Sequence, residues 1–264
     1  MSWRNSWIPG VNRVLRPEAR RLRGAVTRRL YPDPWKGMRR LQPVDSRFGM
    51  GRGTPVDRVY IERFLEAHKP LIRGHVLEVG DDRYTSKFGG SAGTRRSVLD
   101  LSPRSGVSIV GDLTKGIQGY EQAFDCLLLT QVLPFLFDVE DAVATVQRVC
   151  KAGGAALVTF PGISQISRYD MDRSGDFWRF SDASAKRLFA RAFGDDNVRV
   201  HTYGNLLTAT ALLHGIAAEE LAAEETDHRD PDYPVIIGVV ARARSSSSTA
   251  HSGASDVGVD RLPL

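Results

Sequence analysis

Three acidic residues stand at the ends of short apolar segments of this chain. Glu78 lies in the run VLEV, Asp100 ends the run SVLD 22 residues later, and Asp112 follows the run SIVG after another 12 residues. An ionised carboxylate can accept hydrogen bonds from two adjacent hydroxyl groups of a ligand. Each acid alone is more often a solvated turn residue or a helix cap than a ligand contact. Their order and spacing therefore carry the prediction of a ligand site.

Small and polar residues accompany these acids. Gly80 directly follows the first apolar run, and Thr130 and Gln131 come at the end of another, FDCLLLT. Glycine lets the backbone approach a ligand where a β-carbon would clash. The same segment ends thus offer both carboxylates and close backbone approach.

The apolar runs have the length of buried strands. We expect strands at 75–79, 97–101, 107–110, 124–130, 155–160, 198–204 and 234–243, with helices at 54–68, 139–152, 182–193 and near 206–225. Alternating strands and helices predict an α/β fold, namely a Rossmann-like, doubly wound, seven-stranded and mostly parallel sheet with one antiparallel strand. Ligands of such sheets bind beyond the carboxyl ends of the strands, where the acids and Gly80 would meet.

Over residues 55–241 the sequence resembles the class I S-adenosylmethionine (SAM)-dependent methyltransferases. The resemblance is carried by VLEVG (76–80), VLDLSP (98–103), GDL (111–113), FDCLLLTQVLPFL (124–136) and RVCKAGGAALVTFPG (148–162), in which Ala152 replaces the usual proline. It implies SAM as cofactor. It also implies that Gly80 approaches the methionine part, that Asp100 accepts both ribose hydroxyls and that Asp112 contacts the adenine amino group.

Twelve residues are predicted to contact the cofactor on this basis: Glu78, Gly80, Asp81, Asp100, Leu101, Gly111, Asp112, Leu113, Thr130, Gln131, Arg58 and Tyr60. Arg58 and Tyr60 are included because the early segment RGTPVDRVYIERFL (52–65) looks like one that closes over the cofactor's carboxylate end. After Gly80 the chain continues with Asp81 and Asp82 instead of further glycines, which predicts a bulkier and more polar loop. The missing G-x-G-x-x-G pattern argues against a dinucleotide.

The segment 161–182, PGISQISRYDMDRSGDFWRFSD, follows the fifth expected strand and is rich in polar and aromatic residues. It is similar to a segment of bacterial methyltransferases found beside glycosyltransferases, which implies a sugar-like or glycosylated natural-product acceptor. A tryptophan face suits a sugar or aromatic ring. We predict catalytic roles for Asp170 and Tyr169, and acceptor contacts from Arg168, Trp178 and Arg179. Whether oxygen or nitrogen is methylated stays open.

Histidine offers alternative general bases, because it titrates near neutral pH. His201, at a strand end, and His214, on a late helix, are the two candidates. The histidines and two cysteines lack metal-ligand spacing, so metal-independent transfer is expected.

Charge is distributed unevenly along the 264 residues. Residues 1–45 contain three acids and eleven basic residues, namely Arg4, Arg13, Arg16, Arg20, Arg21, Arg23, Arg28, Arg29, Lys36, Arg39 and Arg40, in a chain of net charge +5. We predict a basic N-terminal extension over 1–50, a methyltransferase domain over 51–243 and a disordered serine-rich tail over 244–264. The extension is either a solvated arm or a contact for anionic lipid, nucleic acid or a diphosphate-bearing substrate.

The chain contains no apolar run of about 18 residues and no signal-peptide pattern. With two cysteines, it is expected in the reducing cytoplasm. The sequence does not indicate an oligomeric state.

Two alternatives remain. An RNA methyltransferase is favoured by the basic arm and the pI of about 9.4, but Thr130 to Leu133 do not match the Asp/Asn-Pro-Pro-aromatic motif of enzymes that methylate nucleic-acid amino groups. Nucleic acid is therefore the less favoured partner. The second alternative is a non-catalytic, methyltransferase-like binding protein.

Overall fold

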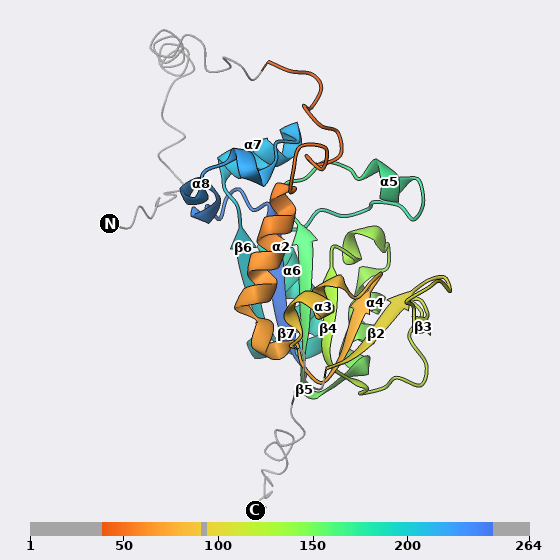
Figure 1. Cartoon of the computed structure of the whole chain (residues 1–264). Coiled ribbons are helices and arrows are strands. Elements are labelled where there is room, and N and C mark those ends of the chain that lie inside the picture. Colours follow the sequence, from red (N-terminus) through yellow and green to blue (C-terminus); the bar gives the residue numbers. More distant parts are fainter. Residues whose placement is uncertain (1–38, 91–93, 245–264) are drawn as a thin grey trace, which may run out of the picture. The chain divides into compact units, whose positions relative to one another are not determined.

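The structure is a computed structural model and describes residues 39–90 and 94–244 (Figure 1). The compact unit that carries the sheet begins at Pro43. The predicted basic extension and serine-rich tail fall mostly outside the described residues, so both stay predictions. Within the described residues, no helix is long and apolar enough to cross a membrane.

Seven strands form one mixed sheet in the order β3-β2-β1-β4-β5-β7-β6. Their bounds are β1 (His75–Val79), β2 (Arg95–Asp100), β3 (Ile109–Val110), β4 (Phe124–Thr130), β5 (Cys150–Pro161), β6 (Val198–Tyr203) and β7 (Ile236–Arg242). β7 runs antiparallel to both of its neighbours, whereas the remaining strand pairs are parallel. The predicted fold class is confirmed.

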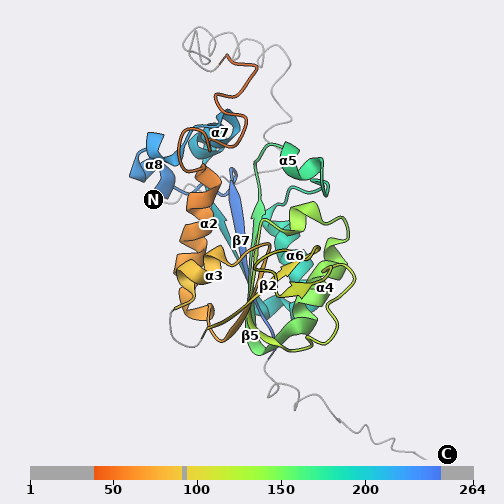
Figure 2. The ribbon, with the colours of Figure 1, turned by 45° about the vertical axis from the view of Figure 1, so that its right-hand side comes forward.

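Helices cover both faces of the sheet (Figure 2). One face packs against α2 (Val56–Ala67), α3 (Arg83–Phe88) and α7 (Leu206–His214), and the other against α4 (Val139–Val149) and α6 (Asp182–Phe193). Along β4, Cys126 and Leu128 belong to the core on the side of α2, α3 and α7, whereas Leu127 and Leu129 belong to the core on the side of α4 and α6. Successive side chains of a strand point to opposite faces, so this alternation is expected. Burial on both faces explains the unbroken apolar runs.

Two helices end earlier than the sequence pattern predicts. α4 ends at Val149, because Cys150 is already extended and begins β5. The helix expected near 206–225 breaks at Gly215, whose φ of 68° caps α7 in the left-handed conformation. The remaining short elements are α5 (Arg168–Met171), α8 (Ala223–Asp227), and the 3-10 turns η2 (Lys69–Leu71), η3 (Leu133–Phe135), η4 (Asp195–Asn197) and η5 (Ala218–Glu220).

The close packing of α2 on the sheet depends on a glycine of β7. A β-carbon at Gly238 would stand 2.5–2.9 Å from three ring carbons of Phe64. Glycine therefore allows the helix to lie directly on the strand. The packing of Phe64 fixes the height at which the first turn of α2 reaches the carboxyl edge of the sheet.

Candidate functional site

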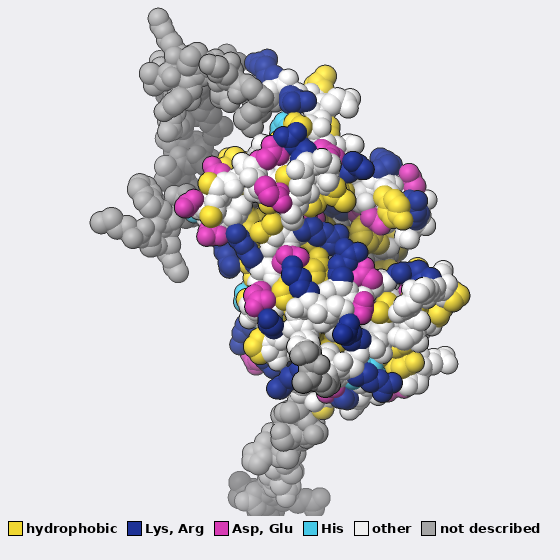
Figure 3. Space-filling view, in the orientation of Figure 1, with side chains coloured by type: hydrophobic (Ala, Val, Ile, Leu, Met, Phe, Trp, Pro, Cys, Tyr) yellow, Lys and Arg dark blue, Asp and Glu magenta, His cyan; other side chains and the backbone are white. Residues whose placement is uncertain are grey.

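The sheet changes its winding direction between β1 and β4, and two cavities meet at this point. β1 is followed outward by β2 and β3, whereas β4 is followed on the other side by β5. Open α/β sheets bind ligands in the crevice at such a switch point. In Figure 3 the surface is hollowed beside α2, with lysine and arginine side chains inside the hollow.

The larger cavity has a volume of about 660 Å³ and extends over the ends of β1, β2 and β4, within the usual size of small-molecule sites. Eight of the twelve predicted cofactor contacts line it: Gly80, Asp100, Leu101, Gly111, Asp112, Leu113, Thr130 and Gln131. The sequence did not single out Phe135, Leu136, Phe137 and Asp138, which follow β4. It also did not single out Arg173, Ser174 and Phe177 of the segment 161–182, which is called the insertion from here on. The topology thus brings most of the predicted set to one wall.

Gly80 forms a smooth part of that wall. Its φ is 91°, its N–H donates to the carbonyl oxygen of Leu99 at 2.9 Å, and a β-carbon there would meet no atom within 4 Å. The backbone is therefore held in a conformation that favours glycine, while the side facing the cavity is open. A ligand can approach the main chain here.

Asp100 faces the larger cavity but carries a partner in this structure. Its Oδ2 accepts from the Arg104 guanidinium at 2.7 and 2.9 Å, its Oδ1 accepts from the Ser102 N–H, and the same guanidinium also donates to the Gly80 carbonyl oxygen. Burial pushes the pKa of Asp100 upward, but hydrogen bonds from Ser102 and Arg104 outweigh it and lower the pKa. The carboxylate is ionised at neutral pH.

Asp112 supplies the second carboxylate of this wall. Its Oδ1 accepts from the N–H and hydroxyl of Thr114 at 2.9 and 2.7 Å, and Lys115 Nζ lies 3.5 Å from Oδ2. Burial again raises the pKa and the Thr114 hydrogen bonds outweigh it, so the pKa lies below its ordinary value. Donor groups of a ligand would thus find acceptors beyond both β2 and β3.

Glu78 and Asp81 do not line the cavity, contrary to expectation. Glu78 is buried, and its carboxylate accepts from the Tyr84 N–H at 3.1 Å and from the N–H and hydroxyl of Thr85 at 2.7 Å each. It therefore satisfies the first N–H groups of α3. Asp81 pairs with Arg83 at 2.7 Å. The bulky loop expected after Gly80 is in fact a short link into this helix.

Replacing Glu78 with glutamine should destabilise the fold. The amide keeps one acceptor oxygen but turns a donor toward Tyr84 or Thr85, which leaves a buried N–H without a partner. Such a group costs about 1–3 kcal/mol. Urea denaturation should show this loss in the free energy of unfolding. An unchanged transition midpoint would rule out the capping role.

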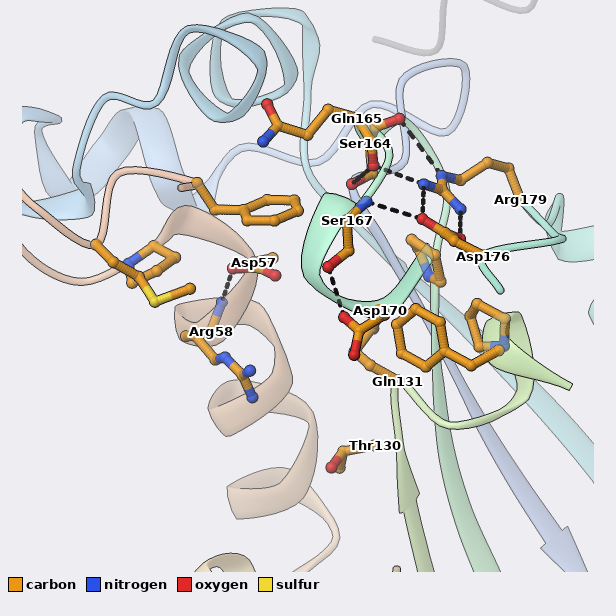
Figure 4. A pocket seen from close by; sticks show the side chains of 16 residues that line it. Asp57, Arg58, Thr130, Gln131, Ser164, Gln165, Ser167, Asp170, Asp176 and Arg179 are labelled. Carbon is orange, nitrogen blue, oxygen red and sulfur yellow. Dashed lines mark hydrogen bonds and ion pairs between the residues drawn. The ribbon is translucent and has the colours of Figure 1, made fainter. Parts of the chain in front are cut away.

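The smaller cavity has a volume of about 250 Å³ and lies between α2, the end of β4 and the insertion (Figure 4). It shares Thr130, Gln131 and Phe135 with the larger cavity. Arg58, predicted to bind the cofactor, lines this smaller cavity instead and donates to the Tyr84 hydroxyl at 3.0 Å. The two cavities therefore join at the carboxyl end of β4.

Gln131 stands at this junction in an unusual backbone conformation. Its φ is 58°, in the left-handed region that non-glycine residues seldom occupy. Its N–H donates to the carbonyl oxygen of Thr159 at 3.1 Å, which ties the turn to β5. Backbone strain of this kind is concentrated at functional sites, and here it lies where the cavities meet.

Two carboxylates enter the smaller cavity from opposite sides, Asp57 from α2 and Asp170 from α5 (Figure 4). Asp57 accepts the Arg58 N–H at 2.8 Å, and burial raises its pKa above the ordinary value. Asp170 accepts from the Ser167 hydroxyl at 2.5 Å. Asp170 was predicted and Asp57 was missed, because an acid in the first turn of a helix is ordinarily explained by the helix dipole.

Arg179, predicted to contact the acceptor, lines the smaller cavity, and its guanidinium holds the insertion together. It forms a bidentate pair with Asp176 at 2.5 and 2.8 Å and also donates to the carbonyl oxygens of residues 164, 165 and 178. Asp176, whose side chain is 1% exposed, accepts in addition from the Ser167 N–H. This pair fixes the loop that presents Asp170.

Three neighbouring predictions lie outside both cavities. Tyr169 is 67% exposed, with the Arg173 guanidinium 3.5 Å above its ring. Arg168 is exposed and 3.9 Å from Asp172. Trp178 donates its indole N–H to the Leu136 carbonyl oxygen at 3.0 Å and packs against Phe137, so it supports the rim of the larger cavity without lining it.

The predicted histidine bases and Tyr60 also lie away from the cavities. His201 packs against His68 beyond the carboxyl end of α2, with ring centroids 4.9 Å apart. The His214 carbonyl oxygen accepts from the Val44 N–H at the end of α7. Tyr60 is buried against Tyr203. His201 and Tyr60 thus lie between the sheet and α2. None of the three residues is at the cavities where the sequence led us to expect them.

Among the described residues, no group of three or more His, Cys, Asp or Glu side chains is arranged to hold a metal ion.

Comparisons with known proteins found similar solved structures. No protein-family model matches the chain, and no curated protein does. The citrinin polyketide synthase CMeT domain aligns with a TM-score of 0.50 and 12% identity over 72% of this chain and 54% of that one. A SAM-dependent methyltransferase from Archaeoglobus fulgidus aligns with a TM-score of 0.46 and 11% identity, over 70% and 93% of the chains. At these identities the likeness shows the fold alone.

Proposed function

We propose that this protein is a SAM-dependent methyltransferase that holds SAM in the larger cavity and a small acceptor in the smaller one. The observation that carries the proposal is the junction of the two cavities at Thr130 and Gln131. Methyl transfer requires the donor and the acceptor to meet without intervening water, because orientation and desolvation supply much of the rate. Two cavities that share these lining residues would bring donor and acceptor side by side.

The larger cavity fits the chemistry of SAM. Gly80 offers a backbone face on which a β-carbon would fill the space, and Asp100 supplies an ionised acceptor for the ribose hydroxyls. Asp112 is proposed to accept from the adenine amino group, with Leu101 and Leu113 as apolar neighbours on the same wall. Arg58, which lines the smaller cavity where the two share Thr130, is proposed to pair with the carboxylate end of SAM across the junction. Bound SAM supplies an activated methyl group.

Of the described residues that line the smaller cavity, Asp57, Asp170 and Asp176 carry carboxylates, and Asp176 is already paired with Arg179. Asp57 and Asp170 are therefore the groups proposed to take a proton from an acceptor. Asp57 is the better base, because burial raises its pKa toward the working range. Asp170 is held by Ser167 and suits positioning of the acceptor. Arg179 and Asp176 keep the insertion in place. A sugar-like or other small acceptor suits the volume of about 250 Å³, and a cytoplasmic location remains our expectation.

A first experiment is calorimetric titration with SAM and S-adenosylhomocysteine, followed by transfer of labelled methyl from SAM to a mixture of small acceptors. We expect binding at micromolar to submillimolar concentration and a matching rise in the melting temperature through linkage. No heat and no thermal shift at millimolar SAM would remove the proposal. Salt-sensitive binding of tRNA or rRNA below micromolar concentration would revive the RNA alternative.

Arg104 gives a more specific prediction for the cofactor cavity. Its guanidinium occupies the Asp100 carboxylate and the Gly80 carbonyl oxygen, two groups that the cofactor needs. Replacing Arg104 with alanine should therefore tighten SAM binding, by up to about fivefold, because an exposed ion pair is worth up to about 1 kcal/mol. Calorimetry measures the change. Weaker binding by Arg104→Ala would show that the guanidinium instead contributes to the cofactor site.

A further inference from the structure

The charged groups of the smaller cavity are not equally available to a ligand. Asp176 and Arg179 neutralise each other, and Arg179 also serves three carbonyl oxygens of the insertion. Either group could bind an acceptor's charge only by giving up contacts that shape the loop. Breaking a buried pair leaves an uncompensated charge, which is strongly unfavourable.

Arg58 is the remaining cation of this cavity, and it points elsewhere. Its guanidinium bonds to Tyr84 of α3, the helix that follows the Gly80 turn. Figure 4 shows it directed along α2 toward Thr130, whereas Asp57 and Asp170 lie nearer the insertion. In the proposed function this cation faces the carboxylate end of SAM. It is therefore not available at the acceptor end.

Two carboxylates, those of Asp57 and Asp170, remain at the end of the smaller cavity near the insertion, which we call the acceptor end. Their charge determines which acceptors fit. A phosphate or carboxylate group would meet Asp57 and Asp170 as like charges, which raises its free energy in a partly buried site. An ammonium group has three N–H donors and a positive charge, so it forms charge-assisted hydrogen bonds with both. The Ser167 hydroxyl lies beside Asp170 as a further partner.

We infer that the acceptor is a primary or secondary amine, held as an ammonium group by Asp57 and Asp170 and methylated on nitrogen. This inference rests on the proposed function. The ammonium first gives one proton to Asp57, which exposes the nitrogen lone pair. A nitrogen–carbon bond to the methyl group then forms as the sulfur–carbon bond breaks. The sulfonium charge passes to the methylated ammonium, so no further reactant is needed.

The inference can be tested with two small scaffolds, each supplied as amine, alcohol and phosphate: glucosamine, glucose and glucose 6-phosphate, and benzylamine, benzyl alcohol and benzyl phosphate. Each is incubated with full-length protein and labelled SAM, and mass spectrometry locates the added methyl. We expect methylation on nitrogen of an amine. Transfer to an alcohol or phosphate at an equal or higher rate would overturn the inference and leave the methyltransferase proposal standing. The inference is also overturned if SAM binds and neither amine is methylated.

Variants separate charge recognition from a general structural effect. Asp170→Asn should raise KM for the accepted amine by about 10- to 100-fold, since hydrogen bonds to charged groups are the stronger ones, while the Kd for SAM is unchanged. Asp141→Asn is the matched control, because Asp141 is exposed in the first turn of α4 and lines neither cavity. Equal KM values for Asp170→Asn and wild type would contradict recognition of the ammonium by this carboxylate. Failure of SAM to bind wild-type protein would instead refute the proposed function itself.

Discussion

Replacing Gly80 with alanine is expected to weaken SAM binding by about 5- to 100-fold while leaving the protein folded. The added methyl group would project into open space at the cavity wall, where the ligand has to lie against the backbone. Overpacking of this kind costs about 1–3 kcal/mol, and each 1.4 kcal/mol is a tenfold change in Kd. Calorimetric titration of the variant with SAM measures the effect.

The backbone contribution to this effect needs its own control. Alanine at a φ of 91° costs roughly 1–2 kcal/mol of stability through the left-handed conformation alone. Gly153→Ala carries the same kind of strain, since Gly153 has a φ of 76° and an open surrounding, but it lies at the opposite end of β5 from the cavities. Both variants should lose similar stability, and Gly80→Ala alone should lose affinity. An equal loss of affinity in both would show that strain, and not occupancy of the cavity, is responsible.

Asp57→Asn is expected to lower kcat by about 10²- to 10⁴-fold, the usual contribution of a general base, with little change in the Kd for SAM. The pH dependence gives the sharper test. Because burial raises the pKa of Asp57, the base is protonated below that pKa and active above it. Wild-type kcat should therefore rise with pH through a range above the ordinary aspartate pKa of about 3.9. The rise should be absent in Asp57→Asn.

Asp170→Asn separates catalysis from positioning in the same cavity. It keeps Asp57 and should therefore retain the pH-dependent rise, with its main effect on KM. If both variants lost the rise equally, the two carboxylates would titrate as a coupled pair, and no single base could be assigned. A wild-type profile that is flat between pH 4 and 8 would remove Asp57 as the base.

The wall of the larger cavity was predictable from the sequence because it depends on short segments and on topology. Gly80, Asp100 and Asp112 follow strands directly, and a parallel sheet must bring the ends of its strands to one edge. Glu78 shares their sequence environment and still lies elsewhere. It precedes Val79 in β1, and successive residues of a strand face opposite sides, so its carboxylate meets α3 whereas Val79 reaches the cavity.

The smaller cavity was less predictable because its walls come from elements that are far apart in the sequence. Asp57 lines the cavity because α2 packs closely on β7, through a contact between Phe64 and Gly238, which are far apart in the sequence. In the insertion, the Asp176–Arg179 pair turns Asp170 inward and leaves Tyr169 and Arg168 outside. The local sequence names all three candidates but contains nothing that selects the one facing inward.

The contact between Gly238 and Phe64 has a consequence for how the acceptor range of this fold can change. Gly238 is in β7, outside both cavities, yet any side chain there would lift Phe64 and with it the whole of α2. Asp57 and Arg58 belong to that helix, so the distances from both side chains to Thr130 would increase together. One substitution in the middle of a strand could thus enlarge the space for an acceptor without altering a single residue that touches it.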